Sequence, residues 1–193
     1  MRSTAIIRIG ITLTALALAG CNTEAPGGVT DPVASSNATR EPRYVDKSDR
    51  PQVTFDPCLD LPDATLVEAG YDPKSEETAD FTPDSYTFLG CSYDTPQRLY
   101  GLNVLSGNIS FAEEQEKTKA FAEAIEINGR RALLDWQPDV RDECSVSMKT
   151  AYGILIVSRI ILKDSAGPSP ESEWCAGLED TARIFEPFLP KGE

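Results

Sequence analysis

Gly153-Ile154-Leu155-Ile156-Val157-Ser158-Arg159-Ile160-Ile161-Leu162 is the stretch of sequence that decides the fold. Apolar side chains run almost continuously through it, and Ile154, Ile156, Ile160 and Ile161 are β-branched. Branched side chains favour extended backbone, and a nearly unbroken apolar run is typical of a strand inside a sheet. We therefore expect residues 153–162 to form a central strand.

Five further segments have the composition or alternation of β-strands. They are residues 86–93, 98–105, 124–127, 130–136 and 144–150. Asn128-Gly129, between the third and the fourth of these, is the strongest hairpin signal in the chain. Asp94-Thr95-Pro96-Gln97 indicates a second hairpin between the first two. The sequence thus predicts an antiparallel sheet of about five or six strands.

Three segments are expected to be helical. The first is residues 64–69, which Gly70 follows, and the second begins at Phe111 because Ser110-Phe111-Ala112-Glu113 is a capping box. Ser169-Pro170-Glu171 opens a final helix, in which four residues recur at helical spacing: Cys175, Leu178, Ala182 and Phe185. The predicted fold class is α+β, with helices flanking the sheet.

The N-terminus has the features of a bacterial lipoprotein signal peptide. Leu18-Ala19-Gly20-Cys21 follows the short apolar stretch 9–17, and Arg2 and Arg8 precede that stretch. The stretch is shorter than the roughly 20 residues of a membrane-spanning helix. We expect residues 1–20 to be removed and Cys21 to carry a diacylglyceryl group, which places the protein on the extracytoplasmic face of the cell membrane. The alternative is an ordinary secreted protein whose leader ends near a cysteine.

The segment that follows Cys21 is rich in Pro, Gly, Ser, Thr and Asp as far as Arg50. It has few large apolar residues to offset the entropy lost on ordering. We therefore expect residues 21–50 to be a lipidated flexible tether and residues 51–193 to form one globular extracytoplasmic domain.

The chain is acidic, with 18 Lys and Arg residues against 31 Asp and Glu residues and a formal net charge of −13. This balance argues against nucleic acid as a partner, because phosphate binding needs clustered Lys and Arg. The acidity favours solubility near an anionic envelope, and attraction to cations or basic partners is the alternative interpretation.

Four cysteines remain once Cys21 is assigned to lipidation: Cys58, Cys91, Cys144 and Cys175. An even number in an exported chain indicates two disulfides, and three pairings are possible. We favour Cys58–Cys91 and Cys144–Cys175, each of which would join a helix end to a neighbouring strand. The cysteines form no CxxC pair and the chain has no histidine, so we expect neither a metal site nor a cofactor.

Five short motifs, taken in order, resemble an uncharacterised family of actinobacterial lipoproteins that contains a domain of unknown function. They are Phe55-Asp56-Pro57-Cys58, Gly90-Cys91-Ser92-Tyr93, Asn128-Gly129-Arg130-Arg131-Ala132, Cys144-Ser145-Val146-Ser147 and Trp174-Cys175-Ala176-Gly177-Leu178. The resemblance implies an envelope location and two disulfides. It implies no established activity, so it supplies no catalytic residues.

No catalytic arrangement is evident in the sequence. Without histidine the chain cannot build a Ser-His-Asp or Cys-His site. Four acidic residues gather around Trp136, and they could be a solvated loop or the carboxylates of a hydrolase: Asp135, Asp139, Asp142 and Glu143. Five aromatic residues could line a ligand groove, although a role in the core is favoured: Tyr86, Tyr93, Tyr100, Trp136 and Trp174.

Three classes of function are consistent with these features. The first is a non-enzymatic binding or accessory lipoprotein that captures an envelope lipid, glycan, peptide or partner protein. The second is a structural or assembly component that docks to an envelope protein complex. The third is an envelope hydrolase that uses carboxylates. We favour the first, because an anchor, a tether and a small disulfide-linked domain are predicted and no catalytic group is evident.

Overall fold

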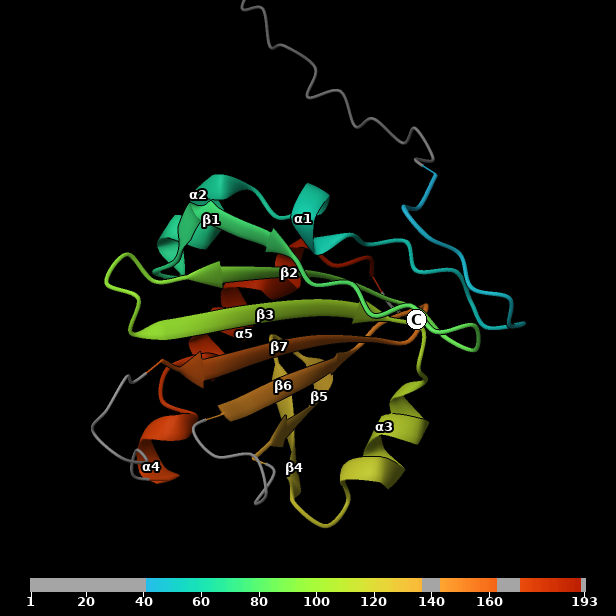
Figure 1. The fold of residues 1–193 in the computed structure, drawn as a ribbon. Coiled ribbons are helices and arrows are strands. Elements are labelled where there is room, and N and C mark those ends of the chain that lie inside the picture. The colour runs from blue at the N-terminus through green and yellow to red at the C-terminus, as the bar shows by residue number, and fades with distance from the viewer. Residues whose placement is uncertain (1–40, 137–142, 163–170, 192–193) are drawn as a thin grey trace, which may run out of the picture. The chain divides into compact units, whose positions relative to one another are not determined.

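The structure is a computed structural model that describes residues 41–136, 143–162 and 171–191. Its seven strands form one antiparallel sheet in the order β1-β2-β3-β7-β6-β5-β4 (Figure 1). The strands are β1 Asp72–Thr78, β2 Phe88–Asp94, β3 Tyr100–Gly107, β4 Ala122–Ile127, β5 Arg130–Asp135, β6 Glu143–Lys149 and β7 Ile154–Ile161. The α+β class with an antiparallel sheet is confirmed, but the strand count exceeds the expected five or six.

The strand that the sequence analysis missed is β1. Its sequence, Asp72-Pro73-Lys74-Ser75-Glu76-Glu77-Thr78, has no large apolar residue and no alternation. Among the described strands it pairs with β2 alone, with an irregular register between Asp72 and Glu77. An edge strand needs no apolar outer side, and charged residues and proline are common there because they discourage pairing with other chains.

Strand β7 is central, as expected, and lies between β3 and β6. Its alternate residues point to opposite faces of the sheet. Leu155, Val157 and Ile161 belong to the main core, whereas Ile154 and Ile156 belong to a second cluster on the other face. Both faces bury apolar side chains, which explains why the run is apolar without alternation.

Three short helices cover the main core: α1 Pro57–Asp60, α2 Asp63–Glu68 and α5 Leu178–Phe185. α1 contacts β2, α2 contacts β1, and α5 contacts β6 and β7. Figure 1 shows α5 behind the central strands and α1 and α2 beside β1 and β2. The side chains of Leu66, Leu178 and Phe185 are almost completely buried between these helices and the sheet.

The expected C-terminal helix is two helices, so the single helix predicted from the sequence is wrong. α4 spans Glu171–Trp174, and α5 begins after Gly177, whose φ of 76° is left-handed. A left-handed residue stops an α-helix, and glycine adopts this conformation without a steric penalty. A 3₁₀ turn, η1 Glu186–Phe188, follows α5.

The other face of the sheet carries α3 Phe111–Thr118. The predicted capping box is present, because the Ser110 side chain accepts from the Glu113 N–H while the Glu113 carboxylate accepts from the Ser110 N–H. Phe111 packs with Leu133 and Ile154 in the second cluster. This side of the sheet is called the α3 face below.

The Asn128-Gly129 hairpin is also confirmed. It joins β4 to β5, and Asn128 and Gly129 have φ values of 50° and 84°. Positive φ at both central residues is the requirement of a type I′ turn. Ile127 is opposite Arg130 in the resulting register, and Glu126 is opposite Arg131.

Residues 41–50, which the sequence analysis placed in the tether, contact the domain. Arg43 pairs with Asp56, Lys47 with Asp84, and Arg50 with Glu113. The compact unit accordingly extends from Arg40 to Glu193. None of the helices in the described ranges is long and apolar enough to cross a membrane.

Candidate ligand-binding site

The tip of the β4–β5 hairpin carries two consecutive arginines that point to opposite faces of the sheet. Arg130 lies on the α5 face, where its Nε donates to Glu186 at 2.8 Å. Its other nitrogens donate to the carbonyl oxygens of Lys149 and Pro190. Only 11% of the Arg130 side chain is exposed. Arg130 therefore holds the hairpin to η1 and the C-terminal segment.

Arg131 lies on the α3 face, and its guanidinium carbon is 4.9 Å from the centre of the Phe111 ring. Glu126 is directly opposite in the strand register, yet the two side chains form no ion pair. Among the described residues, Arg131 has no hydrogen-bonding partner. Because the aromatic ring accepts no conventional hydrogen bond, the N–H donors of Arg131 are available to a ligand.

Arg131 lines two surface hollows. The first has a volume of about 440 Å³ and lies between α3 and the β4–β5 hairpin. It is lined by Phe111, Gln115, Ala124, Ile125, Glu126, Arg131, Ala132 and Leu133. The second has a volume of about 390 Å³ and lies at the hairpin tip. It is lined by Asn128, Gly129, Arg130, Arg131, Lys149, Glu186 and Lys191. Both volumes fall in the range of small-molecule sites.

The two hollows differ in chemistry. Most residues of the first, which we call the apolar hollow, are aliphatic or aromatic. The second, which we call the cationic hollow, has four cationic side chains and one carboxylate, Glu186, among its described lining residues. Glu186 is paired with Arg130. Arg131 and Lys191 thus add positive charge to one concave place on a chain whose net charge is −13.

The N-terminal segment supports the wall formed by α3. Arg50 donates two hydrogen bonds, of 2.8 and 2.7 Å, to the carboxylate of Glu113. These bonds, together with those from Ser110, hold the pKa of Glu113 well below its usual range. The start of α3, and with it Phe111, is thereby held against the sheet.

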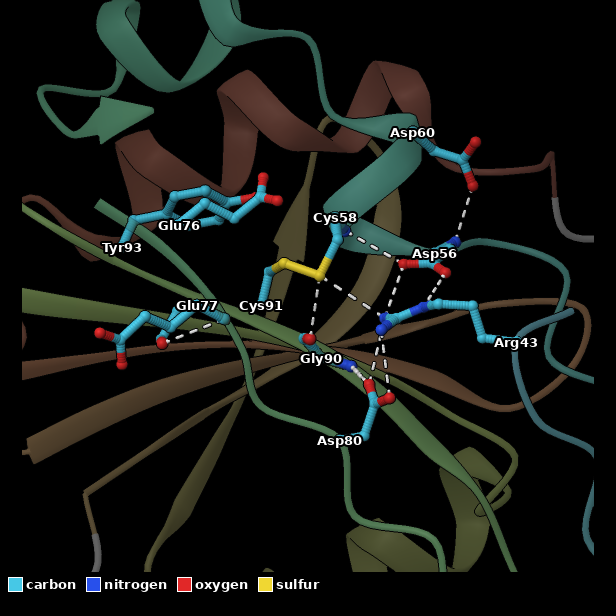
Figure 2. The surroundings of a disulfide bond; sticks show 11 residues. Arg43, Asp56, Cys58, Asp60, Glu76, Glu77, Asp80, Gly90, Cys91 and Tyr93 are labelled. Carbon is cyan, nitrogen blue, oxygen red and sulfur yellow. Dashed lines mark hydrogen bonds and ion pairs between the residues drawn. A yellow bond between two sulfur atoms is a disulfide. The ribbon is translucent and has the colours of Figure 1, made fainter. Parts of the chain in front are cut away.

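A second cluster of polar side chains surrounds the Cys58–Cys91 disulfide (Figure 2). Asp56 is buried, and it caps α1 by accepting from the Cys58 N–H at 3.1 Å. Arg43 donates to both carboxylate oxygens of Asp56, at 2.5 and 2.9 Å. This bidentate pair is the main contact between the N-terminal segment and α1.

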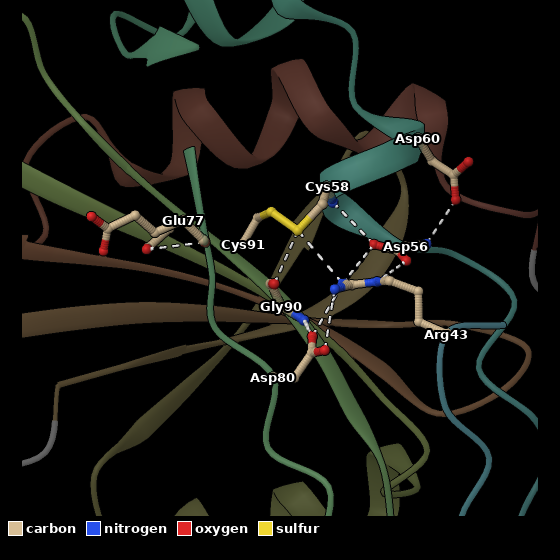
Figure 3. A network of polar contacts seen from close by, with 9 residues as sticks. Arg43, Asp56, Cys58, Asp60, Glu77, Asp80, Gly90 and Cys91 are labelled. Atoms are coloured by element: carbon tan, nitrogen blue, oxygen red, sulfur yellow. Dashed lines mark hydrogen bonds and ion pairs between the residues drawn. A yellow bond between two sulfur atoms is a disulfide. The ribbon is translucent and has the colours of Figure 1, made fainter. Parts of the chain in front are cut away.

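Asp80 completes this cluster, as Figure 3 shows. It accepts from Arg43 at 3.1 Å and from the Gly90 N–H at 2.8 Å. The Sγ of Cys58 lies 3.1 Å from the Gly90 carbonyl oxygen, but a disulfide sulfur has no proton to donate, so this is a close contact only. The cluster joins residues 41–50 to α1 and β2.

The Cys58–Cys91 cluster is not a metal site in this oxidised state. The sulfurs of Cys58 and Cys91 lie within 4.8 Å of a Glu76 carboxylate oxygen. Thiolate is the form of cysteine that binds metals, and both sulfurs are in the disulfide. Glu76 instead accepts a hydrogen bond of 3.2 Å from the Tyr93 hydroxyl.

The second disulfide joins Cys144 on β6 to Cys175 after α4, with a Cα–Cα distance of 5.2 Å. The two disulfides expected from the cysteine count are therefore present. Arg159, on β7, donates to the carbonyl oxygens of Glu173 and Ala176, so this end of α4 has a second attachment to the sheet.

Comparison with known protein families gives one result. The family model described as a protein of unknown function, DUF3558, matches residues 16–187. The chain belongs to the DUF3558 family. Neither the curated proteins nor the solved structures contain a match to this DUF3558 chain.

The acidic residues predicted around Trp136 are brought together in part. Asp135 ends β5 opposite Ser145, and Glu143 lies two positions before Ser145 on β6, so both carboxylates are on the α3 face. Burial raises the pKa of Glu143, although a hydrogen bond with Ser158 opposes the shift. Asp139 and Asp142 lie outside the described residues, as does Cys21.

The five aromatic residues do not line either hollow. Tyr93 and Trp174 belong to the main core, and Tyr100 and Trp136 pack against it. Tyr86 contacts the rings of Phe81 and Phe88. Their favoured role in the core is thus confirmed for four of the five.

The sequence analysis did not identify the hollows of this DUF3558 chain. Phe111 was noted only as a helix start, and Arg130 and Arg131 only as part of a motif. A clue was present nonetheless, because Arg130 and Arg131 are consecutive cations at a hairpin tip in an acidic chain.

Proposed function

We propose that this DUF3558 protein is a non-enzymatic binding or accessory module of the bacterial cell envelope. A lipid on Cys21 would hold it on the extracytoplasmic face of the membrane, and the residues up to about 40 would act as a tether. The leader motif, the acidic composition, the two disulfides and the resemblance to actinobacterial lipoproteins support this proposal.

The observation that carries the binding role is the pair of hollows that Arg131 lines. A hollow with apolar walls and a few polar groups at its rim is the usual form of a small-molecule site. The N–H donors of Arg131 have no partner among the described residues, so a ligand could supply one.

A hydrolase is the second candidate, supported by Asp135 and Glu143 on one face of the sheet and by the raised pKa of Glu143. It predicts turnover of an envelope glycan or peptide that Glu143→Gln abolishes. The hollows at Arg131 are lined by different residues, so Arg131→Gln would leave such turnover unchanged.

Two measurements test the proposal. For the anchor, wild-type and Cys21→Ser chains are compared by detergent-phase partitioning of cells; we expect only the wild type to enter the detergent phase. For the binding role, residues 21–193 with Cys21→Ser are exported by a bacterial host and weighed by native mass spectrometry. We expect a non-covalent adduct that Arg131→Gln removes. A bare protein with measurable turnover would overturn the binding role.

A further inference from the structure

We infer that the site at Arg131 takes an amphiphile with an anionic headgroup, such as a phospholipid monomer. The headgroup would occupy the cationic hollow, and the acyl chain would lie in the apolar hollow against Phe111. This inference rests on the proposed binding role and names the chemical class of its ligand.

Charge is the first argument. The fold needs Arg130, because Glu186 and two backbone carbonyls hold its guanidinium. Arg131 and Lys191 contribute no such structural contact among the described residues, yet they line the same hollow. Like charges gathered in a concave place repel one another, and an anionic ligand relieves that repulsion. An anion is therefore the chemistry that this hollow complements.

The two hollows have one lining residue in common. Arg131 is the residue that their linings share. Its guanidinium rests on the Phe111 ring at 4.9 Å, so a charged group and an apolar surface meet at one place. A free anion would use only the cationic hollow, and a neutral lipid would use only the apolar one. An amphiphilic anion would use both.

Glu126 sets the direction in which the ligand lies. It lines the apolar hollow and is opposite Arg131 in the strand register. Its carboxylate disfavours an anionic group at that end, so the headgroup is directed toward the hairpin tip. Replacing Glu126 with glutamine should therefore strengthen binding of an anion, whereas replacing Arg131 should weaken it.

The test is isothermal titration calorimetry of residues 21–193 with Cys21→Ser. The probe is dihexanoyl phosphatidylglycerol below its micelle concentration. Glycerophosphoglycerol carries the headgroup phosphodiester charge without the chains, and dihexanoyl phosphatidylcholine has the chains without net charge. We expect the anionic lipid to bind at least about tenfold more tightly than either comparator, because each lacks one of the two contacts.

Three variants locate the binding. Arg131→Gln should weaken it about tenfold, and Glu126→Gln should strengthen it several-fold. Arg98→Gln is the matched control, because the Arg98 side chain is 81% exposed and lies outside both hollows. It should bind as the wild type does. Circular dichroism of each variant checks that the fold is retained.

Other results overturn the inference. Equal affinity for glycerophosphoglycerol would mean an anion site without an acyl site, and equal affinity for phosphatidylcholine would mean an apolar site without charge selection. An anionic lipid that binds Arg131→Gln unchanged would place the site elsewhere. If no probe binds but native mass spectrometry finds an uncharged cargo, this inference fails and the binding role stands; if enzymatic turnover is found instead, both fail.

Discussion

The guanidinium of Arg131 lies over the ring of Phe111 and does not pair with Glu126, its cross-strand neighbour. Arg131 is on β5 and Phe111 is the first residue of α3, so this contact joins the hairpin to the helix across the apolar hollow. The contact holds Arg131, which lines both hollows, beside the apolar one. It is also open to a direct energetic test.

A double-mutant cycle measures the Arg131–Phe111 contact. A cation–π contact made by an exposed cation contributes about 0.5–1 kcal/mol, so Arg131→Gln should lower the free energy of unfolding in urea by that amount. In a Phe111→Leu background the same change should have almost no effect. Glu126→Gln is the control and should change stability by less than about 0.5 kcal/mol. Equal effects of Arg131→Gln in both backgrounds would show that the contact contributes nothing.

The contact of the N-terminal segment with the domain can be tested through Arg43. Arg43→Gln leaves the carboxylate of Asp56, which is only 3% exposed, without its cation. The loss of a charged hydrogen-bonding partner at a buried group costs about 1–3 kcal/mol. Lys47→Gln is the matched control, because Lys47 and Asp84 are 78% and 76% exposed and such pairs contribute little. If Arg43→Gln and Lys47→Gln lower the free energy of unfolding in urea by the same amount, Arg43 does not hold the N-terminal segment to the domain in this way.

The disulfide pairing is checked by peptide mapping without reduction. We expect one linked peptide pair that contains Cys58 and Cys91 and another that contains Cys144 and Cys175. Replacing Cys58 and Cys91 with alanine should destabilise the domain by about 3 kcal/mol, since each disulfide closes a loop of about 30 residues. A peptide that joins Cys58 to Cys175 would mean that the pairing is wrong.

The raised pKa of Glu143 makes a prediction about pH. Burial makes the native state hold this proton more tightly than the unfolded chain, whose ordinary value is 4.5. Protonated Glu143 therefore contributes fully to stability at pH values below 4.5. This contribution is lost as the pH rises through the pKa that Glu143 has in the folded protein. Glu143→Gln should therefore be more stable than the wild type at pH 7 but not at pH 4.

Thermal unfolding at the two pH values measures this difference. Glu116→Gln, at a side chain that is 73% exposed, makes the same chemical change on the surface of α3 and should have little effect at either pH. A Glu143→Gln variant whose advantage over the wild type does not grow with pH would show that burial does not disfavour the charged carboxylate.

Local sequence signals predicted much of the fold. The apolar run of β7, the Asn128-Gly129 turn and the capping box at Ser110 each act over a few residues, and each is present in the structure. β1 was missed because an edge strand needs no apolar pattern. The break in the C-terminal helix lies at Gly177, whose φ of 76° is left-handed, and the presence of a glycine does not by itself specify that conformation.

The candidate site could not be predicted in the same way, because its parts are far apart in the sequence. Phe111 and Arg131 meet only when α3 packs on the β4–β5 hairpin. Arg50 reaches Glu113 across 63 residues, and nothing near Arg50 in the chain indicates that partner. Such contacts follow from tertiary packing, which local propensity does not contain.

The most direct test of the account is chemical-shift mapping of ¹⁵N-labelled residues 21–193 with Cys21→Ser, titrated with dihexanoyl phosphatidylglycerol. The account predicts that the shifted amides cluster in residues 111–115, 124–133 and 186–191, and that Arg131→Gln removes the shifts. Shifts that centre instead on Asp135 and Glu143, or no shifts at any lipid concentration below micelle formation, would contradict it.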